Sequence, residues 1–242
     1  MQKTSSLLLL LASLTALPIA SAQAEHTNRW RVDAALNLFL SGLDGDLASR
    51  GVPTTVEADF SDIAEHLNFA AAGRLSIGTG HWTFSTEVSY MDLGATTPNA
   101  RTSLDQWMVE PSLSYNFCDA FAVFAGARYN SIETGIDLNG PIGLASSGHQ
   151  DWVDPIVGAQ IALPIAGEKL SLNGRFDVGG FEVGSDLTWQ VFPYFDWRFA
   201  KSASLQLGYR WLGTDYETGS GPTFFRYDVV LAGPQIGLTM HF

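Results

Sequence analysis

The chain ends in a stretch whose residues alternate between apolar and small or polar types. From Val230 to Phe242 every even-numbered position is apolar, and the intervening positions from Gly233 to His241 are small or polar. Successive side chains on a β-strand point to opposite faces, so one face of this stretch suits hydrocarbon and the other a polar interior. The pattern predicts a strand in the wall of a membrane barrel.

Nine earlier stretches show the same alternation. With the last one, the expected strands are 29–41, 67–78, 82–92, 104–117, 121–130, 151–163, 169–178, 187–199, 203–212 and 227–242. A strand that crosses a bilayer at a tilt of about 45° needs roughly 9–11 residues. We therefore expect an all-β protein, with residues 25–242 forming one closed antiparallel transmembrane β-barrel. Ten strands are expected, or eight if the first or third hairpin is misread.

Aromatic residues fall near both ends of these strands, on the apolar face in every case except Tyr227. One end has Trp30, Trp82, Phe117, Phe121, Phe199 and Phe242, and the other has Tyr90, Trp107, Tyr129, Trp189, Trp211 and Tyr227. Such paired aromatic girdles mark the two interfaces of a membrane barrel, whereas a soluble β-sandwich turns its apolar face inward.

The connections also alternate in length. Residues 79–81, 118–120, 164–168 and 200–202 are short, as periplasmic turns are, while the others, including 43–66 and 131–150, are longer and rich in Gly, Asp, Ser and Thr. An even strand number then places both termini in the periplasm. Gly179, Gly180 and Gly184 indicate a tight hairpin. Pro111, Pro155, Pro193 and Pro234 lie inside strands, where we expect bulges or bends.

The first 24 residues have the features of a secretory signal peptide. Lys3 precedes a short apolar run over 7–12, and Ala22-Gln23-Ala24 forms a small-x-small cleavage site. No later segment has about 18 consecutive apolar residues, which excludes a helical span. The single cysteine, Cys118, excludes a lipid anchor and an intramolecular disulfide. A net charge of −12 argues against nucleic acid as a partner.

The polar face carries six acidic residues and six arginines. They are Arg31, Asp33, Arg74, Glu87, Glu110, Arg128, Asp154, Arg175, Asp177, Asp196, Arg198 and Arg210. The turn positions place Arg74 across from Glu87 and Glu110 across from Arg128. This charge network either lines a pore or forms a salt-bridged plug. We favour the plug, because charge balance suits structure better than ion selectivity.

Residues with catalytic or metal-binding potential are few. Outer-membrane enzymes place such groups at the outer rim, where this chain offers His66 and His149, the latter two residues before Asp151. No partnered serine is marked, so we expect no catalytic residue and no cofactor. Asp44-Gly45-Asp46 has too few oxygen ligands for calcium, so no metal is expected. His81 and His241 fall at the periplasmic interface.

The first long connection is acidic. It contains Asp44, Asp46, Glu57, Asp59, Asp62 and Glu65 against Arg50. It is either a solvated loop or a partner for lipopolysaccharide phosphates through divalent cations. Phe60, Ile63, Ala64 and Leu67 recur at helical spacing, which predicts a short helix capped by Asp59 or Ser61.

Several runs resemble a widespread, largely uncharacterised group of proteobacterial outer-membrane β-barrel proteins. They include FSDIAEHLNF (60–69), WTFSTEVSYMDL (82–93), DPIVGA (154–159), RFDVGGFEVGSDLTWQ (175–190), LGYRWLGTDY (207–216) and AGPQIGL (232–238). The resemblance implies an outer-membrane location, with membrane lipid and lipopolysaccharide as neighbours. It also implies that the barrel-assembly machinery reads Phe242 as an assembly signal, and it implies no catalytic residue.

The expected function is a structural, surface-interaction or narrow small-solute channel role without enzymatic activity. The alternative is an outer-membrane enzyme acting on lipid or peptide at the extracellular rim. The sequence leaves the oligomeric state open.

Overall fold

The computed structural model describes residues 30–49, 52–58, 67–96, 100–138, 144–167 and 169–242, and strands make up nearly all of it. The strands are β1 (Arg31–Phe39), β2 (Gly42–Ser49), β3 (Val52–Ala58), β4 (Leu67–Thr79), β5 (Trp82–Thr96), β6 (Ala100–Cys118), β7 (Phe121–Leu138), β8 (Leu144–Ala166), β9 (Leu170–Gly180), β10 (Leu187–Ala200), β11 (Ala203–Thr218) and β12 (Phe225–His241). A 3₁₀ turn, η1 (Gly221–Thr223), precedes β12. In this part of the chain no helix is long and apolar enough to cross a membrane. The expected signal peptide lies outside the described residues.

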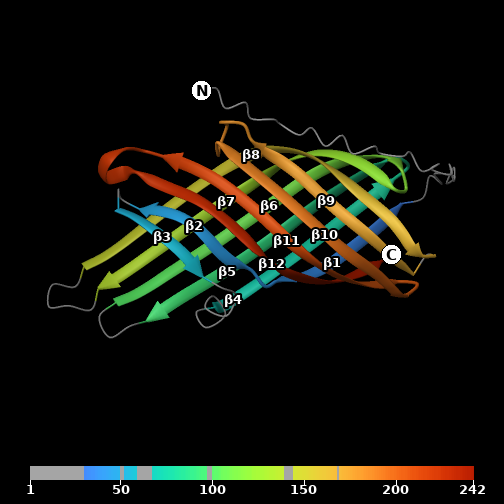
Figure 1. The fold of residues 1–242 in the computed structure, drawn as a ribbon, viewed down its shortest axis with the longest axis horizontal. Coiled ribbons are helices and arrows are strands. Elements are labelled where there is room, and N and C mark those ends of the chain that lie inside the picture. The colour runs from blue at the N-terminus through green and yellow to red at the C-terminus, as the bar shows by residue number, and fades with distance from the viewer. Residues whose placement is uncertain (1–29, 50–51, 59–66, 97–99, 139–143, 168) are drawn as a thin grey trace, which may run out of the picture.

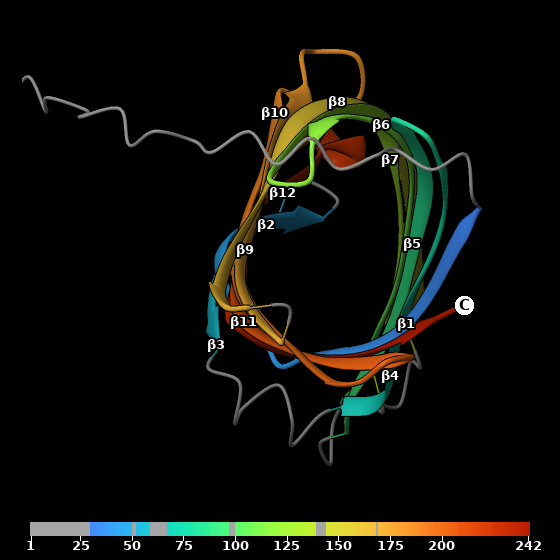
Figure 2. The ribbon, with the colours of Figure 1, turned by 90° about the vertical axis from the view of Figure 1, so that its right-hand side faces the viewer.

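Ten antiparallel strands close into a barrel (Figures 1 and 2). Each strand of the series β1, β4, β5 and so on to β12 pairs with the next, and β12 pairs back with β1, where Asp33 lies opposite His241. Closure leaves no open edge between the first and last strands, which is the way a sheet satisfies its backbone in lipid. The predicted ten-stranded antiparallel barrel is confirmed.

The alternation of the sequence separates the two faces of the wall. On β12, Gln235, Gly237 and Thr239 are buried toward the lumen, while Ile236, Leu238 and Met240 are exposed on the outside. The aromatic residues at the turn end are also exposed outward, with Trp30 at 70% and Phe242 at 77%. Tyr227, the exception noted in the sequence, is buried inside. An apolar band of this kind has hydrocarbon as its natural solvent.

One end of the barrel, called here the turn end, holds the short connections. Two residues close the turns Gly80–His81, Asp119–Ala120 and Lys201–Ser202, as the sequence predicted. The opposite end, called the loop end, has longer strands than expected: β7 runs to Leu138 and β8 begins at Leu144. The prediction of a loop over 131–150 is therefore wrong for most of that range. A strand that rises beyond the membrane needs no apolar face, so hydrophobic alternation does not mark it.

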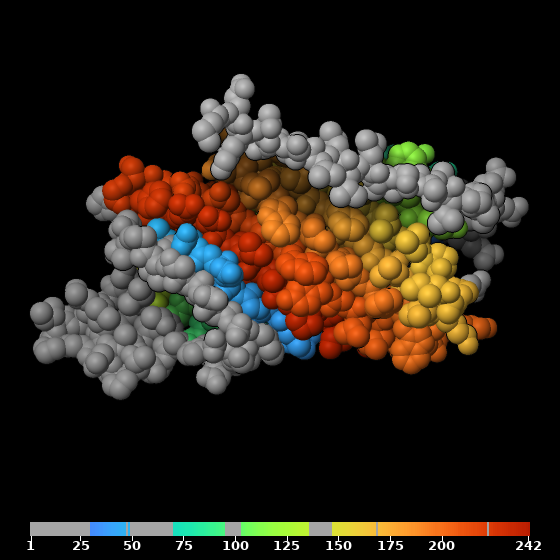
Figure 3. Space-filling view, viewed as in Figure 1, coloured from blue at the N-terminus to red at the C-terminus, as the bar shows by residue number. Residues whose placement is uncertain are grey.

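The first predicted loop, 43–66, is also corrected. Strands β2 and β3 form a hairpin within it, and β2 pairs with the loop-end half of β12, where Leu43 lies opposite Leu231. Figure 3 shows β2 in blue beside β12 in red. The register of β2 on β12 continues that of β1, so β1 and β2 form one interrupted strand. The short helix predicted at Phe60, Ile63 and Ala64 lies outside the described residues, and Leu67 begins β4.

The four prolines inside strands cause no register shift, so the bulge that was one of the two expected outcomes, a bulge or a bend, does not form. The strand registers continue unchanged past Pro111, Pro155, Pro193 and Pro234. Glycines accommodate the first three, because a Cβ on Gly126, Gly179 or Gly208 would lie within 2.4 Å of the proline carbonyl oxygen on the next strand. Adjacent backbones therefore approach closely at these prolines without a shift of register.

Candidate functional site

The centre of the lumen holds a closed ring of four charged side chains, which we call the charged ring. It consists of Glu110 on β6, Arg128 on β7, and Arg175 and Asp177 on β9. The Nε of Arg128 lies 2.7 Å from Oε2 of Glu110, and its Nη2 lies 2.8 Å from Oδ1 of Asp177. Arg175 completes the cycle by pairing with Glu110 and, at 3.2 Å, with Asp177. Each carboxylate thus binds both arginines.

Neighbouring groups extend the charged ring. Arg128 also donates to the hydroxyl of Thr188, at 2.8 Å, and the guanidinium of Arg175 lies over the ring of Phe124. Arg210 on β11 donates to Glu87 at 2.6 Å and to Gln190. Sequence reasoning had no basis for singling out Thr188 or Gln190, since uncharged polar residues are common on every lumen face.

The two cross-strand pairs expected from the turns lie opposite each other in the sheet, but their side chains bond differently. Glu110 binds Arg128, its neighbour on the next strand. Arg74 lies opposite Glu87 in the register, yet Glu87 receives its ion pair from Arg210, across the lumen. The curvature of the wall brings the side chains of β5 and β11 within reach of each other. The register of the β4–β5 hairpin alone cannot predict that contact.

Other members of the predicted charge network do not belong to the charged ring, although Asp154 lies opposite Arg128 in the β7–β8 ladder. Asp154 accepts hydrogen bonds from the indole of Trp152 at 3.0 Å and from the backbone N–H of Ser185 at 2.6 Å. Asp196 accepts from Ser204 and Gln206, each at 3.0 Å, and Asp33 lies 2.6 Å from Nδ1 of His241. Arg31 and Arg198 line a hollow of about 440 Å³ at the turn end. All twelve residues have lumen-facing positions in their strands.

The charged ring is sealed from water. Arg128 is 0% exposed, Glu110 2% and Arg175 5%. Transfer of such ions out of water is expensive, and a complete set of partners offsets that cost, whereas loss of one partner leaves an uncompensated buried charge. Because water does not reach these four charged side chains, they fill the lumen at the level of the charged ring.

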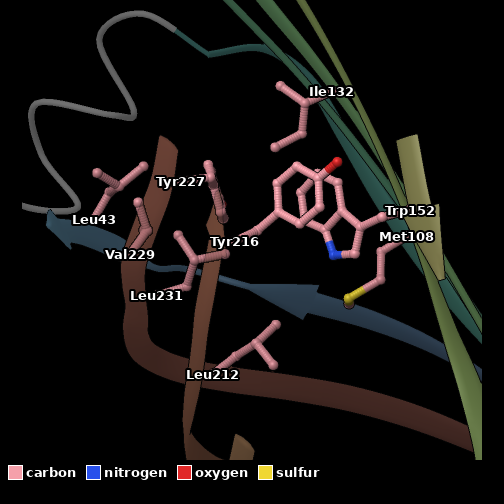
Figure 4. Close-up of a cluster of buried hydrophobic side chains, with 9 residues drawn as sticks. All are labelled: Leu43, Met108, Ile132, Trp152, Leu212, Tyr216, Tyr227, Val229 and Leu231. Atoms are coloured by element: carbon pink, nitrogen blue, oxygen red, sulfur yellow. The ribbon is translucent and has the colours of Figure 1, made fainter. Parts of the chain in front are cut away.

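A cluster of buried apolar side chains lies inside the barrel toward the loop end (Figure 4). Its members are Leu43, Met108, Ile132, Trp152, Leu212, Tyr216, Tyr227, Val229 and Leu231. Trp152 on β8 stacks on Tyr216 of β11, with centroids 4.1 Å apart. Sequence reasoning missed this cluster and expected a polar interior throughout. The available signal was the run Val229–Ala232, in which both faces of the strand are apolar.

The loop-end rim shows little that resembles a catalytic centre. Nε2 of His149 lies 3.4 Å from Oδ1 of Asp151, with both side chains more than half exposed on the outward side of β8. His66 lies outside the described residues. Asp215 lies opposite Asp228 in the sheet, and burial together with that carboxylate raises the pKa of Asp215. In the parts of the chain that the structure describes, no three metal-ligating groups gather, and Asp44 and Asp46 lie on strand β2.

Comparison with solved structures identifies similar barrels. The outer membrane protease OmpT from Escherichia coli superposes with a TM-score of 0.50 and 10% sequence identity, covering 88% of this chain and 96% of that one. Ail, the attachment invasion locus protein of Yersinia pestis, gives 0.44 and 6%, over 88% of this chain and 99% of Ail. The translocator domain of the autotransporter NalP from Neisseria meningitidis gives 0.44 and 9%, over 87% and 88%. No protein-family model and no curated protein sequence matches the chain.

The likeness to OmpT shows a shared barrel fold. Together with the outward apolar band, it makes this chain a transmembrane β-barrel of the bacterial outer-membrane type, as the sequence predicted.

Proposed function

We propose that this protein is a non-enzymatic, non-conducting barrel of the outer membrane, with a structural or surface-interaction role. The observation that carries the proposal is the burial of the charged ring: Arg128 and Glu110 are at most 2% exposed in the middle of the lumen. A water-filled pore at this level would hydrate its charges, as channel linings do. The apolar cluster adds a second layer of buried side chains toward the loop end.

The proposal includes an orientation. The turn end faces the periplasm, and the long strand pairs β6–β7, β7–β8 and β11–β12 project from the cell. Short connections on one side and long ones on the other support this orientation, since barrels of this type have short periplasmic turns. The exposed carboxylates of Asp44 and Asp46 then lie on the cell surface, where divalent cations link them to lipopolysaccharide phosphates.

Single-channel conductance of the refolded protein tests the proposal. The wild-type protein is expected to conduct very little. The double substitution of Glu110→Ala and Arg128→Ala removes two bulky side chains while Arg175 and Asp177 remain paired with each other, so conductance should rise. The matched control is Glu217→Ala with Arg226→Ala, an ion pair of 3.2 Å at the exposed loop end. This control should leave conductance unchanged.

A wild-type conductance similar to that of a general porin, unaffected by the central double substitution, would overturn the plug and support a channel. Hydrolysis of lipid or peptide that His149→Ala abolishes would instead establish the alternative of a rim enzyme.

A further inference from the structure

Among the residues that the structure describes, the ladder between β1 and β4 stops partway along the loop side of the wall. The β1–β4 ladder ends at the pair Asn37 and Ala72. Beyond it, residues Leu67–Ala71 of β4 pair with β5, while the interrupted strand continues as β2 along β12. In the described part of the chain, no ladder joins the loop-end segment of β4 to β2 or β3.

Pro234 explains where the strand is interrupted. The N–H of Leu40 donates to the carbonyl oxygen of Pro234 at 2.9 Å, in the gap between β1 and β2. Proline has no N–H to return the second bond of this pair, so the ladder is weakened at that rung. The neighbouring Gly233 lets the chain approach closely, because a Cβ there would lie 2.1 Å from the carbonyl oxygen of Leu40.

A pocket of about 80 Å³ lies in the wall at this place. Leu38, Ala71 and Tyr90 contribute from positions that face the membrane, whereas Asn37, Met108 and Arg210 contribute from positions that face the lumen. Three successive alanines, Ala70–Ala72, line its β4 side and leave room that larger residues would fill. The lining of the pocket therefore includes residues of the apolar outer band and residues of the lumen face.

Two buried polar atoms in the residues that line the pocket lack a partner. The carboxamide oxygen of Asn37 accepts no hydrogen bond, and Nε of Arg210 donates none; these residues are 8% and 4% exposed. Buried polar groups are nearly always satisfied, so each such exception needs an explanation. One is an acceptor and the other a donor, so a hydroxyl or amide group that enters the pocket finds a partner in either atom.

We propose that this lateral pocket binds an alkyl compound with an uncharged hydroxyl or amide head, taken up from the membrane. The head donates to the oxygen of Asn37, and the chain passes Ala71 and Leu38 into the bilayer. The charge of Arg210 is already matched by Glu87 at 2.6 Å. A carboxylate head would add an unpaired charge in a buried place, so the site selects a neutral head.

Photolabelling in phosphatidylcholine vesicles tests this site. The probe is dodecan-1-ol with a diazirine near its hydroxyl, and mass spectrometry locates the labelled residues. Label should concentrate on Ala70–Ala72 and Met91, which line the pocket. Ala72→Phe places a ring beside Asn37, opposite it in the ladder, and should block the probe's hydroxyl from the carboxamide oxygen. The label should then fall about tenfold, the factor that corresponds to the loss of one buried hydrogen bond. The matched control is Ala162→Phe, a lumen-facing alanine that lines the roomy hollow at the turn end.

A second arm tests recognition of the head. Asn37→Leu keeps the size of the side chain and removes the acceptor, so labelling by the alcohol should fall while labelling by the matching alkane does not. A dodecanoic acid probe should label the pocket weakly in the wild type. Equal labelling around the whole membrane face, unchanged by Ala72→Phe and Asn37→Leu, would overturn the site and indicate ordinary lipid contact. Folding of each variant is checked by the heat-dependent shift in gel mobility. The result is independent of conductance, because the pocket lies on the loop side of the charged ring.

Discussion

Each carboxylate of the charged ring binds two arginines, and this reciprocity determines how single residues contribute to stability. Removal of one charged side chain leaves the ring with a net charge, while the three remaining charged groups stay buried. Removal of an adjacent pair leaves the other pair intact. The energetic effect of a substitution in this ring therefore depends more on charge balance than on how many hydrogen bonds the replaced side chain made.

The substitution Glu110→Gln should destabilise the barrel by about 3–5 kcal/mol, because it leaves Arg128 and Arg175 with one carboxylate between them. Urea unfolding in lipid vesicles measures the change. Glu217→Gln, in the half-exposed pair with Arg226, serves as the control and should cost less than about 1 kcal/mol. An equally small effect of Glu110→Gln would mean that water reaches the charged ring.

At the scale of elements, the hairpin of β9 and β10 is short at the loop end. Its strands end at Gly180 and Leu187, well below the loop-end start of β8 at Leu144, while β11 continues a short way past its pairing with Leu187, to Thr218. The gap above it is spanned by Trp152 and Tyr216, stacked at 4.1 Å. The backbone of the hairpin is tied to β8 through the bond from Ser185 to Asp154. Side chains thus complete the wall where the ladder stops.

Gly180→Ala tests the geometry of that hairpin. Gly180 has φ +88°, and a Cβ there would lie 2.6 Å from the carbonyl oxygen of Ser185. We expect a loss of roughly 3 kcal/mol from backbone strain plus the steric clash. Gly80→Ala is the control, with φ +54° and nothing within 4 Å. It should cost only about 1 kcal/mol for the left-handed backbone. Equal losses in urea unfolding would show that the contact with Ser185 is absent.

Trp152→Ala tests whether side chains span the gap above the hairpin. Loss of a buried indole should cost about 3–5 kcal/mol. It should also speed hydrogen exchange of the β9–β10 amides more than that of β6. Trp197, which is 52% exposed on the membrane face, provides the matched control when changed to alanine. Uniform exchange across the barrel after Trp152→Ala would argue against a local closing role.

For the whole molecule, closure depends on a single seam between the first and last strands. Seven residue pairs join β1 to β12, from Asp33 with His241 to Phe39 with Gln235. The N–H of Phe242 adds a bond of 2.9 Å to the carbonyl oxygen of Val32 beyond the end of β12. This seam must be closed when the barrel lies in the membrane, because an open strand edge in lipid leaves backbone N–H and C=O groups without hydrogen-bond partners.

Deletion of Phe242 should lower the amount of folded protein in the outer membrane several-fold while leaving synthesis and export intact. Phe242→Trp retains an aromatic terminus and the backbone bond, and it should assemble normally. Quantification of the heat-modifiable form in isolated outer membranes measures both. Normal levels of the truncated protein would show that the terminal aromatic residue is not part of the assembly signal.

Local patterns in the sequence determined the wall of this barrel. Alternation with a period of two assigned the two faces, and the short turns set the registers that put Arg74 opposite Glu87 and Glu110 opposite Arg128. The strand ends at the loop end were not predictable in this way. Outside the membrane neither face has to be apolar, so the extensions of β7 and β8 and the β2–β3 hairpin had no distinctive pattern.

Only the tertiary structure decided what fills the barrel. Glu87 and Arg210 are 123 residues apart, and they meet because closure brings β5 and β11 to opposite sides of a narrow lumen. The four-membered charged ring, the stack of Trp152 on Tyr216 and the lateral pocket beside Asn37 depend in the same way on barrel diameter and strand stagger. Barrel diameter and strand stagger are set by all the strands together. Alternation along one strand indicates only which face of the wall a side chain occupies.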